Sequence, residues 1–554
     1  MNKDLVAHGL LLLVGLLLSP LAAGQTLVRS WFGGFQSAMG LAGIQLGDVD
    51  GDSYSDVLLT PYQSSGLATY VASAYSGRTG LPLWTRDIST FGVLSETLGD
   101  INSDGVFDPL LAGFGSATPQ SGEAIILDGK TGVVLRHMYG TVPYQVMQVR
   151  YAGDIDADGC DDLVTPIYSA GLAHWSSGRS GALLFSYLLP YPSPSHLINC
   201  FGCGDMDSDG YDDFLVHYVP NPWQQPAAAV LDLVSGRTLQ VVQAFPAPFG
   251  SFLSTPMAIG DFDGNLEDDF AASDYGWEPP GFSPTADYGG VWVFGRSQPQ
   301  PVAAFVGPAI GAQLGWSVST AGDVNGDGKM DVLVGTPFHR ISLPYYPYVI
   351  YPGSITVLYG GMSPAPLQLL GSPPGRSFGY FVSKIDDLSG DGIPDALVGV
   401  AGDNTAGPDF GAVEAYSFPQ LSNPSQATVF GHACTGSNLL DPRIRAYGTP
   451  RVGAPMMFGM RGAPPAAPTI LVMGNKQTLA LDTLGAPGCV LYASIDWTGV
   501  FVTDFSGRAF FSVTLPSSPA IVGLQQSLSW GVLDAGANQL GLTTSNGLLL
   551  RLGG

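Results

Sequence analysis

A nine-residue pattern of oxygen-bearing side chains in this sequence has the spacing of a cation-binding loop. In its sixth copy, Asp323, Asn325, Asp327 and Asp331 stand at positions 1, 3, 5 and 9, with Gly328 at position 6. The side chains at alternate positions converge when such a loop curls, and glycine permits the sharp turn. Position 7 supplies a backbone carbonyl oxygen, so a cationic side chain there is no obstacle. Flexible sets of oxygen ligands are those that Ca²⁺ prefers, so the pattern predicts a calcium-binding loop.

The pattern occurs seven times, and its first Asp recurs at intervals of 51 to 64 residues. Such regular recurrence indicates a repeat architecture with up to seven Ca²⁺ sites. The predicted ligands at positions 1, 3, 5, 7 and 9 are Asp48, Asp50, Asp52, Tyr54 and Asp56; Asp100, Asn102, Asp104, Val106 and Asp108; Asp154, Asp156, Asp158, Cys160 and Asp162; Asp205, Asp207, Asp209, Tyr211 and Asp213; Asp261, Asp263, Asn265, Glu267 and Asp269; Asp323, Asn325, Asp327, Lys329 and Asp331; and Asp387, Ser389, Asp391, Ile393 and Asp395.

The copies differ in the ligands that they offer. The first, third and fourth copies have Asp at all four side-chain positions and are expected to bind best. The fifth has Asn265 at position 5, and Leu266 replaces the glycine, which disfavours a positive φ. The seventh has Ser389, a weaker ligand, at position 3. The fifth and seventh sites are therefore expected to be the weakest, and the alternative for any copy is a turn that binds no metal.

Short strands surround every copy. An apolar stretch precedes the loop, a run of β-formers follows it, and two further strand-like segments complete each unit, as in GGVWVFG at 289–295. Early units join these two segments by tight turns such as SGRTG at 76–80. Four strands repeated seven times predict an all-β fold, a seven-bladed β-propeller. Either of two segments, 26–32 or 427–431, could close the ring.

The units resemble FG-GAP repeats, the blades of the integrin α-subunit propeller and of many bacterial secreted proteins. Phe378-Gly379, the loop at 387–395 and the ALVG at 396–399 follow the family's order, and so does the sixth unit from Leu314-Gly315 to Pro337. The resemblance covers residues 26–430. It implies calcium in hairpin loops on one face of the propeller, a ligand surface elsewhere, and a role in binding or adhesion.

The charge of the chain agrees with metal sites. The net charge is −25, and the seven loops hold 24 of the 46 Asp and Glu residues at positions 1, 3, 5 and 9. An acidic surface of this kind repels nucleic acid and anionic lipid and attracts cations. The acidity is therefore attributed mainly to metal binding, and no nucleic-acid partner is expected.

The N-terminus is typical of a signal peptide. The apolar run at 10–18 is too short to span a bilayer, and small residues at 22–24 suit cleavage before Gln25. We expect residues 1–24 to be removed, with a membrane anchor as the alternative, and no membrane span in the mature chain. The mature protein is expected to be secreted or on the cell surface, with the periplasm or envelope as alternatives, and to be a monomer.

The repeat ends near residue 430, and residues 431–554 read as a small β-sandwich of strand-like runs and turns. Cys434 and Cys489 both lie in this region and are the expected disulfide pair in an exported chain. The pairing of Cys160, Cys200 and Cys203 stays open, between a local disulfide and buried thiols.

Two aromatic, proline-rich insertions lengthen neighbouring units. They contain Trp277 in one, and Tyr345, Tyr346 and Tyr348 in the other. Aromatic rings stack on sugars and anchor protein interfaces, so these four residues are predicted to bind an unidentified glycan or protein; the alternative is that they cover the core. No catalytic motif has its required context, because the GxSxG at 375–379 is not followed by a helix. We expect a non-catalytic module, with a secreted polysaccharide hydrolase or lyase as the alternative.

Overall fold

The protein is described by a computed structural model. The structure describes residues 26–553 except for 33–41, 53, 61–70, 89–93, 98, 103, 105, 114–122, 140–148, 159, 168–170, 189–197, 208, 210, 220–228, 249–250, 254–255, 266, 280–285, 340, 343–348, 363–364, 372–375, 392, 403–410, 419–425, 439, 448–449 and 519–520. The expected signal peptide lies outside the described residues. Among the residues described, there is no helix long and apolar enough to cross a membrane.

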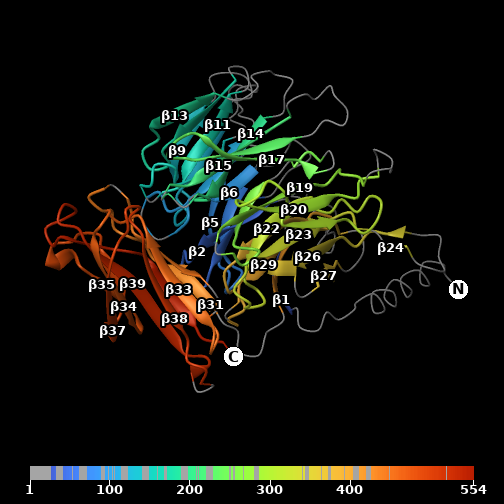
Figure 1. Cartoon of the computed structure of the whole chain (residues 1–554). Coiled ribbons are helices and arrows are strands. Elements are labelled where there is room, and N and C mark those ends of the chain that lie inside the picture. The colour runs from blue at the N-terminus through green and yellow to red at the C-terminus, as the bar shows by residue number, and fades with distance from the viewer. Residues whose placement is uncertain are drawn as a thin grey trace.

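Antiparallel sheets of four strands make up the first three quarters of the chain (Figure 1). Seven such sheets are present in the described residues, and six of them use four strands in chain order. These six are β2 (Gly43–Gly47), β3 (Asp56–Leu59), β4 (Val71–Tyr75) and β5 (Pro82–Asp87); β6 (Leu94–Thr97), β7 (Pro109–Gly113), β8 (Glu123–Leu127) and β9 (Val134–Tyr139); β10 (Arg150–Gly153), β11 (Asp162–Ile167), β12 (Leu172–Ser176) and β13 (Leu183–Leu188); β14 (Ile198–Gly204), β15 (Asp213–Tyr218), β16 (Val230–Val234) and β17 (Val241–Pro246); β18 (Met257–Gly260), β19 (Asp269–Asp274), β20 (Gly290–Gly295) and β21 (Ala303–Val306); and β22 (Ser317–Gly322), β23 (Asp331–Thr336), β26 (Ser354–Leu358) and β27 (Leu367–Leu370).

The seventh sheet joins the two ends of the repeat. It contains β28 (Phe378–Ile385), β29 (Asp395–Val400) and β30 (Ala412–Ser417), and its fourth strand is β1 (Thr26–Phe32), which pairs antiparallel with β30. The N-terminal segment therefore closes the ring, and the competing segment belongs to another sheet. The inner strands contact one another in the order β2, β6, β10, β14, β18, β22, β28 and back to β2. These contacts form a closed propeller, and the predicted all-β propeller fold is confirmed.

Apolar side chains fill the space between neighbouring sheets. Each pair of consecutive sheets shares one buried cluster, and the last pair joins the seventh sheet to the first through Phe381, Trp31 and Val57. The fourth and fifth sheets pack Phe245 edge-on against Phe270, with 5.0 Å between ring centroids. Strands such as β15, β19 and β23 are buried along their whole length, which explains why they read as continuous apolar runs.

A β-bulge turns the chain from the first strand of a sheet into the nine-residue loop. The bulge lies just before the loop at Gly47, Gly153, Gly204, Gly260 and Gly322, where φ is between 73° and 88°. Glycine adopts this left-handed backbone without a steric penalty, and a bulge with glycine at this position bends the strand. The sequence therefore carries a glycine before the loop as well as within it.

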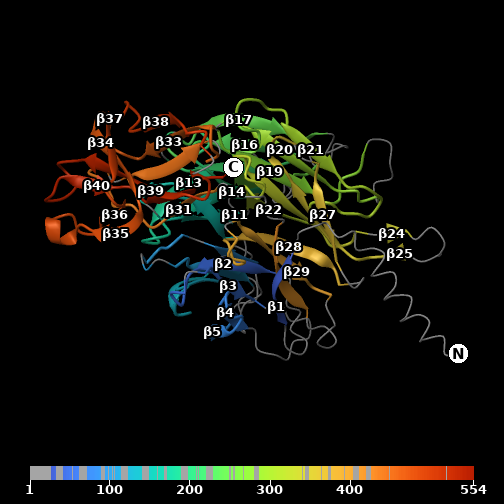
Figure 2. The same ribbon diagram turned by 90° about the horizontal axis from the view of Figure 1, so that it is seen from below.

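The C-terminal strands form a second group beside the propeller, drawn in orange and red in Figures 1 and 2. One sheet contains β31, β41, β39, β34 and β37 in that order, with β40 paired to β39; a second contains β32, β33 and β38; β35 and β36 form a hairpin. Their bounds are β31 (Gln426–Phe430), β32 (Arg443–Tyr447), β33 (Pro455–Arg461), β34 (Pro468–Gly474), β35 (Lys476–Ala480), β36 (Val490–Ala493), β37 (Trp497–Val502), β38 (Ala509–Thr514), β39 (Gln525–Leu533), β40 (Leu542–Thr544) and β41 (Gly547–Arg551).

The two larger C-terminal sheets share one core. Phe458 and Met460 of β33 pack with Leu471 of β34 and Trp530 of β39, and all four side chains are buried. This arrangement is typical of a β-sandwich. The sheets begin slightly earlier than the expected boundary at residue 431, because β31 pairs with β41 along its whole length.

A disulfide bond joins Cys434 and Cys489 in the C-terminal unit, and the two residues are 55 positions apart in the sequence. Cys160, Cys200 and Cys203 are free and buried thiols. Burial raises the pKa of the Cys200 thiol to about 12, so this thiol stays protonated and unreactive.

Replacing both Cys434 and Cys489 by Ser is expected to destabilise the C-terminal unit by about 4 kcal/mol, because a loop of this length restricts the unfolded chain strongly. Thermal unfolding followed by tryptophan fluorescence measures the loss. A reducing agent should produce the same loss in the wild-type protein and none in the variant. An equal response of both proteins to the reducing agent would contradict the assignment.

Candidate metal-binding loops

Each nine-residue loop is the hairpin between the first and second strands of a sheet, numbered here loops 1 to 7 in chain order. The Asp at position 9 begins the second strand or directly precedes it, and all seven of these Asp residues are 0 % exposed. In loop 6, Asp331 Oδ2 accepts a hydrogen bond from the N–H of Val324 at 2.9 Å, which holds the start of the loop. Asp331 Oδ1 accepts a second bond from the N–H of Gly360 at 2.8 Å. The position-9 carboxylate therefore joins its loop to the hairpin between the third and fourth strands.

The glycine of that second hairpin is required by close packing. In loop 1 the N–H of Gly77 donates to Asp56 Oδ1 at 2.9 Å, and a Cβ at Gly77 would overlap the carbonyl group of Ser55. The same contact occurs at Gly129, Gly178 and Gly236. The SGRTG-type turns of the sequence are thus part of the loop structure, because their glycines supply the N–H that the buried carboxylate needs.

Backbone N–H groups shape the rest of each loop. The side-chain oxygen at position 5 accepts a hydrogen bond from the N–H at position 7 in all seven loops, at 2.6 to 3.1 Å. Position 4 takes a positive φ at Gly51, Gly264, Gly326 and Gly390, and at Ala157 in loop 3. Sequence reasoning assigned the tight turn to position 6, where Gly328 has a φ of 88°, and missed position 4. The signal was present, because every copy has Gly, Ala or Ser at position 4.

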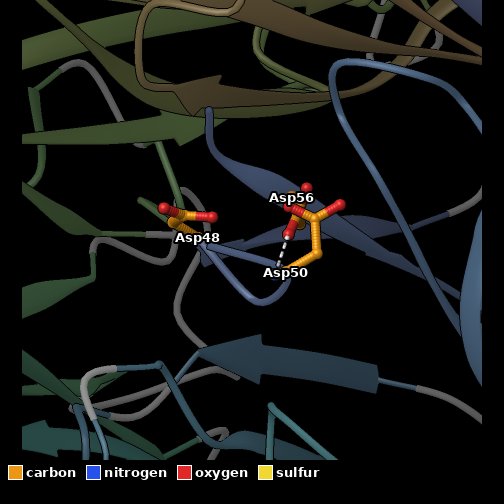
Figure 3. Close-up of side chains that lie close together, drawn as sticks. All are labelled: Asp48, Asp50 and Asp56. Carbon is orange, nitrogen blue, oxygen red and sulfur yellow. Dashed lines mark hydrogen bonds between the residues drawn. The ribbon is translucent and has the colours of Figure 1, made fainter. Parts of the chain in front are cut away.

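Carboxylates at positions 1, 3 and 9 meet at one point in loops 1, 3, 4 and 5. One oxygen from each of the three lies within 4.8 Å of the others. Figure 3 shows the side chains of the group in loop 1, Asp48, Asp50 and Asp56. The N–H of Asp50 donates to Asp56 Oδ2 at 3.3 Å, drawn as the dashed line. The remaining loops have Asn102, Asn325 or Ser389 at position 3 and so bring two carboxylates and a neutral oxygen ligand to these positions.

Burial and mutual repulsion make the ionised form of the position-9 carboxyl groups unfavourable. Burial raises their pKa, and the neighbouring loop carboxylates raise it further. The pKa is raised to about 6 for Asp56, to about 7 for Asp108, Asp162 and Asp269, and to about 8 for Asp213, Asp331 and Asp395.

These residues fit a divalent cation. Their donor atoms are all oxygens, which suits Ca²⁺. A cation between the carboxylates would offset the repulsion that raises their pKa values. The ligands would be the residues at positions 1, 3, 5 and 9 with the carbonyl at position 7.

The loops expected to be weakest keep much of this arrangement. In loop 5, Leu266 lies outside the described residues, and Asp261, Asp263 and Asp269 still form a close carboxylate group. In loop 7, the hydroxyl group of Ser389 donates to Asp387 Oδ1 at 3.3 Å. The Lys329 ammonium of loop 6 donates to the carbonyl oxygen of Asp263 in loop 5 at 3.0 Å, so its charge is directed away from its own loop.

Arginine side chains of the C-terminal unit pair with carboxylates of three loops, and Arg551 donates to the backbone carbonyl of Asp391 in loop 7 at 3.1 Å. Sequence reasoning did not anticipate these contacts. Arg443 Nη2 lies 2.7 Å from Asp154 Oδ2 at position 1 of loop 3, and the Arg461 guanidinium donates to Asp205 Oδ2 at position 1 of loop 4. Arg445 forms a two-pronged ion pair with Asp268 of loop 5. Position 8 is Asp only in loops 3, 4 and 5, so the DD doublets that end these copies were a signal for the contact.

The predicted aromatic binding residues have different outcomes. Trp277 is only 7 % exposed and packs edge-on against Trp292 at 5.4 Å, so the structure places it in the core instead of on a binding surface. Its alternative role as a packing residue is the one that the burial supports. Tyr345, Tyr346 and Tyr348 lie outside the described residues.

Another aromatic group lies at the ends of the blades away from the loops. Trp316 precedes β22, and its ring lies 4.8 Å from that of Tyr275, 5.2 Å from Phe338 and 5.4 Å from Tyr380. Tyr275 follows β19 and is 42 % exposed, while the other three are half-buried. These four residues, called here the aromatic patch, come from the fifth, sixth and seventh sheets, and their gathering on one face is visible only in three dimensions.

The fold and the loops together define a β-propeller with acidic hairpin loops at one end of its blades. A sequence model of the FG-GAP repeat matches residues 314–350, which include the whole of loop 6. The chain is also similar to curated integrin α subunits. The protein is therefore a β-propeller that contains an FG-GAP repeat and is similar in part to integrin α subunits.

The integrin relatives match part of the propeller. Integrin alpha pat-2 of Caenorhabditis briggsae is 28 % identical over 209 residues, which are 35 % of this chain and 17 % of the relative. Integrin alpha-3 of Mus musculus is 31 % identical over 197 residues, 33 % of this chain and 18 % of the relative. Integrin alpha-IIb of Mus musculus is 30 % identical over 127 residues, 21 % of this chain and 12 % of the relative. The chain thus matches less than a fifth of each relative's length.

Proposed function

We propose that this protein is a secreted, calcium-stabilised and non-catalytic propeller that binds a protein or glycan through the face opposite its loops. Integrin-like FG-GAP propellers typically act as interaction and adhesion modules, and this supports a binding function for the present chain. The signal-like N-terminus and the Cys434–Cys489 bond suit an oxidising, extracellular location. The acidic loops are proposed to hold Ca²⁺ and to stabilise the blades.

The aromatic patch is the observation that carries the binding role. Exposed and half-buried aromatic rings gathered on one face are typical of interfaces and of surfaces that stack on sugar rings. The patch draws on three sheets, so the propeller core holds its rings in a fixed arrangement. The cation loops lie at the other end of the same blades, which separates the stabilising function from the binding function.

Replacing Trp316 by Ala is expected to weaken ligand binding about tenfold or more, because this ring contacts the three others and its loss opens the patch. The mature protein is first screened on glycan arrays and immobilised extracellular-matrix proteins, and the affinity for each hit is then measured. Trp497→Ala is the matched control, since Trp497 is an exposed tryptophan on the C-terminal strand β37. Unchanged affinity in Trp316→Ala, with Trp497→Ala impaired, would move the binding site to the C-terminal unit.

A further inference from the structure

The interface between the C-terminal unit and the propeller is built on charge. Arg443 and Arg445 are two positions apart on β32 and so lie on the same face of its sheet, and Arg443 is the cross-strand partner of Arg461 on β33. The three guanidinium groups form ion pairs with loops 3, 4 and 5. The opposite face of the same sheet, with Ile444 and Phe458, belongs to the core of the C-terminal unit. One face of this sheet is thus a cationic surface for the propeller loops.

Loops 3, 4 and 5 are matched to that surface. Each contains five acidic residues, against three or four in the other loops, and the additional Asp at position 8 contacts arginine in loops 4 and 5. Arg461 Nη2 lies 3.5 Å from Asp212 Oδ1. Between the arginines and the loops lies a cleft of about 430 Å³ that is lined by Asp205, Asp268 and Arg461 among others. Small ions can therefore reach the loop carboxylates without removal of the sheet.

The arginine contacts use the carboxylates that a metal would need. In loop 4, Asp205 Oδ1 accepts the N–H of Asp209 at 2.9 Å, and Arg461 occupies Oδ2. In loop 6, the two oxygens of Asp323 accept backbone N–H groups, among them those of Asp327 at 3.0 Å and Gly328 at 2.9 Å, and no arginine pairs with this carboxylate in the described part of the chain. Position 1 thus faces a formal positive charge in loops 3 and 4 and neutral donors in loop 6.

We propose that the arginines of the C-terminal sheet and Ca²⁺ compete for loops 3 and 4, so that metal binding there and docking of the sheet weaken each other. This inference rests on the proposed calcium binding. A guanidinium group and a metal ion that share one carboxylate repel each other, and partial burial reduces screening of that repulsion by salt. Coupling of two binding events is reciprocal, so each must weaken the other by the same factor. Loops 1, 2 and 6, which no arginine of the C-terminal unit contacts within the described residues, would bind Ca²⁺ independently of that unit.

Terbium luminescence can report on loop 4 as the part of the signal that Tyr211→Phe removes. The difference is needed because Tyr151, which interacts with Asp161 of loop 3, and Tyr359, which interacts with Asp331 of loop 6, would sensitise ions there as well. Tyr211 at position 7 of loop 4 would sensitise bound Tb³⁺, and Tyr54→Phe removes the corresponding tyrosine of loop 1 while keeping its carbonyl ligand. In this background Arg461→Gln is expected to tighten Tb³⁺ and competing Ca²⁺ binding about fivefold or more. Arg508→Gln is the matched control, because Arg508 lines the same cleft and makes no carboxylate ion pair in the described part of the chain.

The possible outcomes distinguish failure of the proposed competition from failure of the proposed calcium binding. Equal affinities in Arg461→Gln, Arg508→Gln and the parent would overturn the competition and leave calcium binding intact. Absence of Ca²⁺ binding in all three would overturn both. Hydrogen exchange of the wild-type chain gives a readout without substitutions: Ca²⁺ is expected to slow exchange in the loops and to speed it in β32 and β33. Slower exchange in both regions would overturn the proposal.

Discussion

Removal of calcium is expected to lower the melting temperature of this protein much more at pH 8 than at pH 5.5. At pH 8, carboxyl groups whose pKa is raised to between about 6 and about 8 are at least half ionised and are available to bind metal. A site held at 100 times its Kd adds about 2.7 kcal/mol, so several occupied sites should add on the order of 10 °C to Tm. At pH 5.5, protons compete for carboxylates whose pKa is raised to between about 6 and about 8.

The sign of the metal-free pH dependence follows from the same groups. An Asp in the unfolded chain has a pKa near 3.9. Because Asp213, Asp331 and Asp395 have native pKa values of about 8, the native state binds more protons than the unfolded state between these limits. The stability that these groups contribute is present below the unfolded pKa and is lost as the pH rises through the native pKa. In EDTA, Tm should therefore rise when the pH is lowered from 8 to 5.5.

Scanning fluorimetry in Ca²⁺ and in EDTA, each at both pH values, measures the two effects together. Mg²⁺ serves as the control cation, because it demands a smaller octahedral site and should stabilise less. The same Ca²⁺ effect at both pH values would show that the position-9 carboxylates are not ligands. No Ca²⁺ effect at pH 8 would contradict calcium binding altogether.

Replacing Asp331 by Ala is expected to destabilise the protein strongly even without metal. The substitution leaves the N–H groups of Val324 and Gly360 without their buried acceptor. An unsatisfied buried polar group costs about 1–3 kcal/mol, so the two together should cost about 2–6 kcal/mol. Urea unfolding in EDTA, followed by tryptophan fluorescence, measures the loss.

Asp327→Ala in the same loop separates this structural role from metal binding. Asp327 Oδ1 accepts the N–H of Lys329, and the residue is only part-buried, so its loss in EDTA should cost less than about 1.5 kcal/mol. In Ca²⁺ both variants should lose the stabilisation from this site. Equal destabilisation by Asp327→Ala and Asp331→Ala in EDTA would contradict this explanation, because it attributes the larger loss to the hydrogen bonds by which Asp331 joins the loop to the second hairpin.

Much of the fold was predictable because its signals are local. Alternate ligand positions, the glycines of the turns and the apolar runs after each loop all lie within a few residues of one another. Their regular recurrence indicates repeated four-stranded units. These units must pack against one another, because a single sheet cannot bury both of its faces alone. The predicted sets of ligands also assemble locally, as the close carboxylates of Asp48, Asp50 and Asp56 show.

The remaining features depend on residues far apart in the chain. Two segments had the pattern of the closing strand, and pairing with β30 or with β41 decided between them. Trp277 had the composition of a binding residue, but its burial against Trp292 depends on how the insertion folds back.

The sequence by itself determined that this protein has seven acidic loops on repeated β-sheets, because loop chemistry and strand period are properties of short segments. Only the tertiary structure decided what surrounds those loops. Arg443 meets Asp154 across 289 positions of sequence, and Trp316 meets Tyr380 from a different sheet. Such contacts arise when closure of the ring and docking of the C-terminal sheets bring distant surfaces together, and no local pattern encodes which residues then face each other.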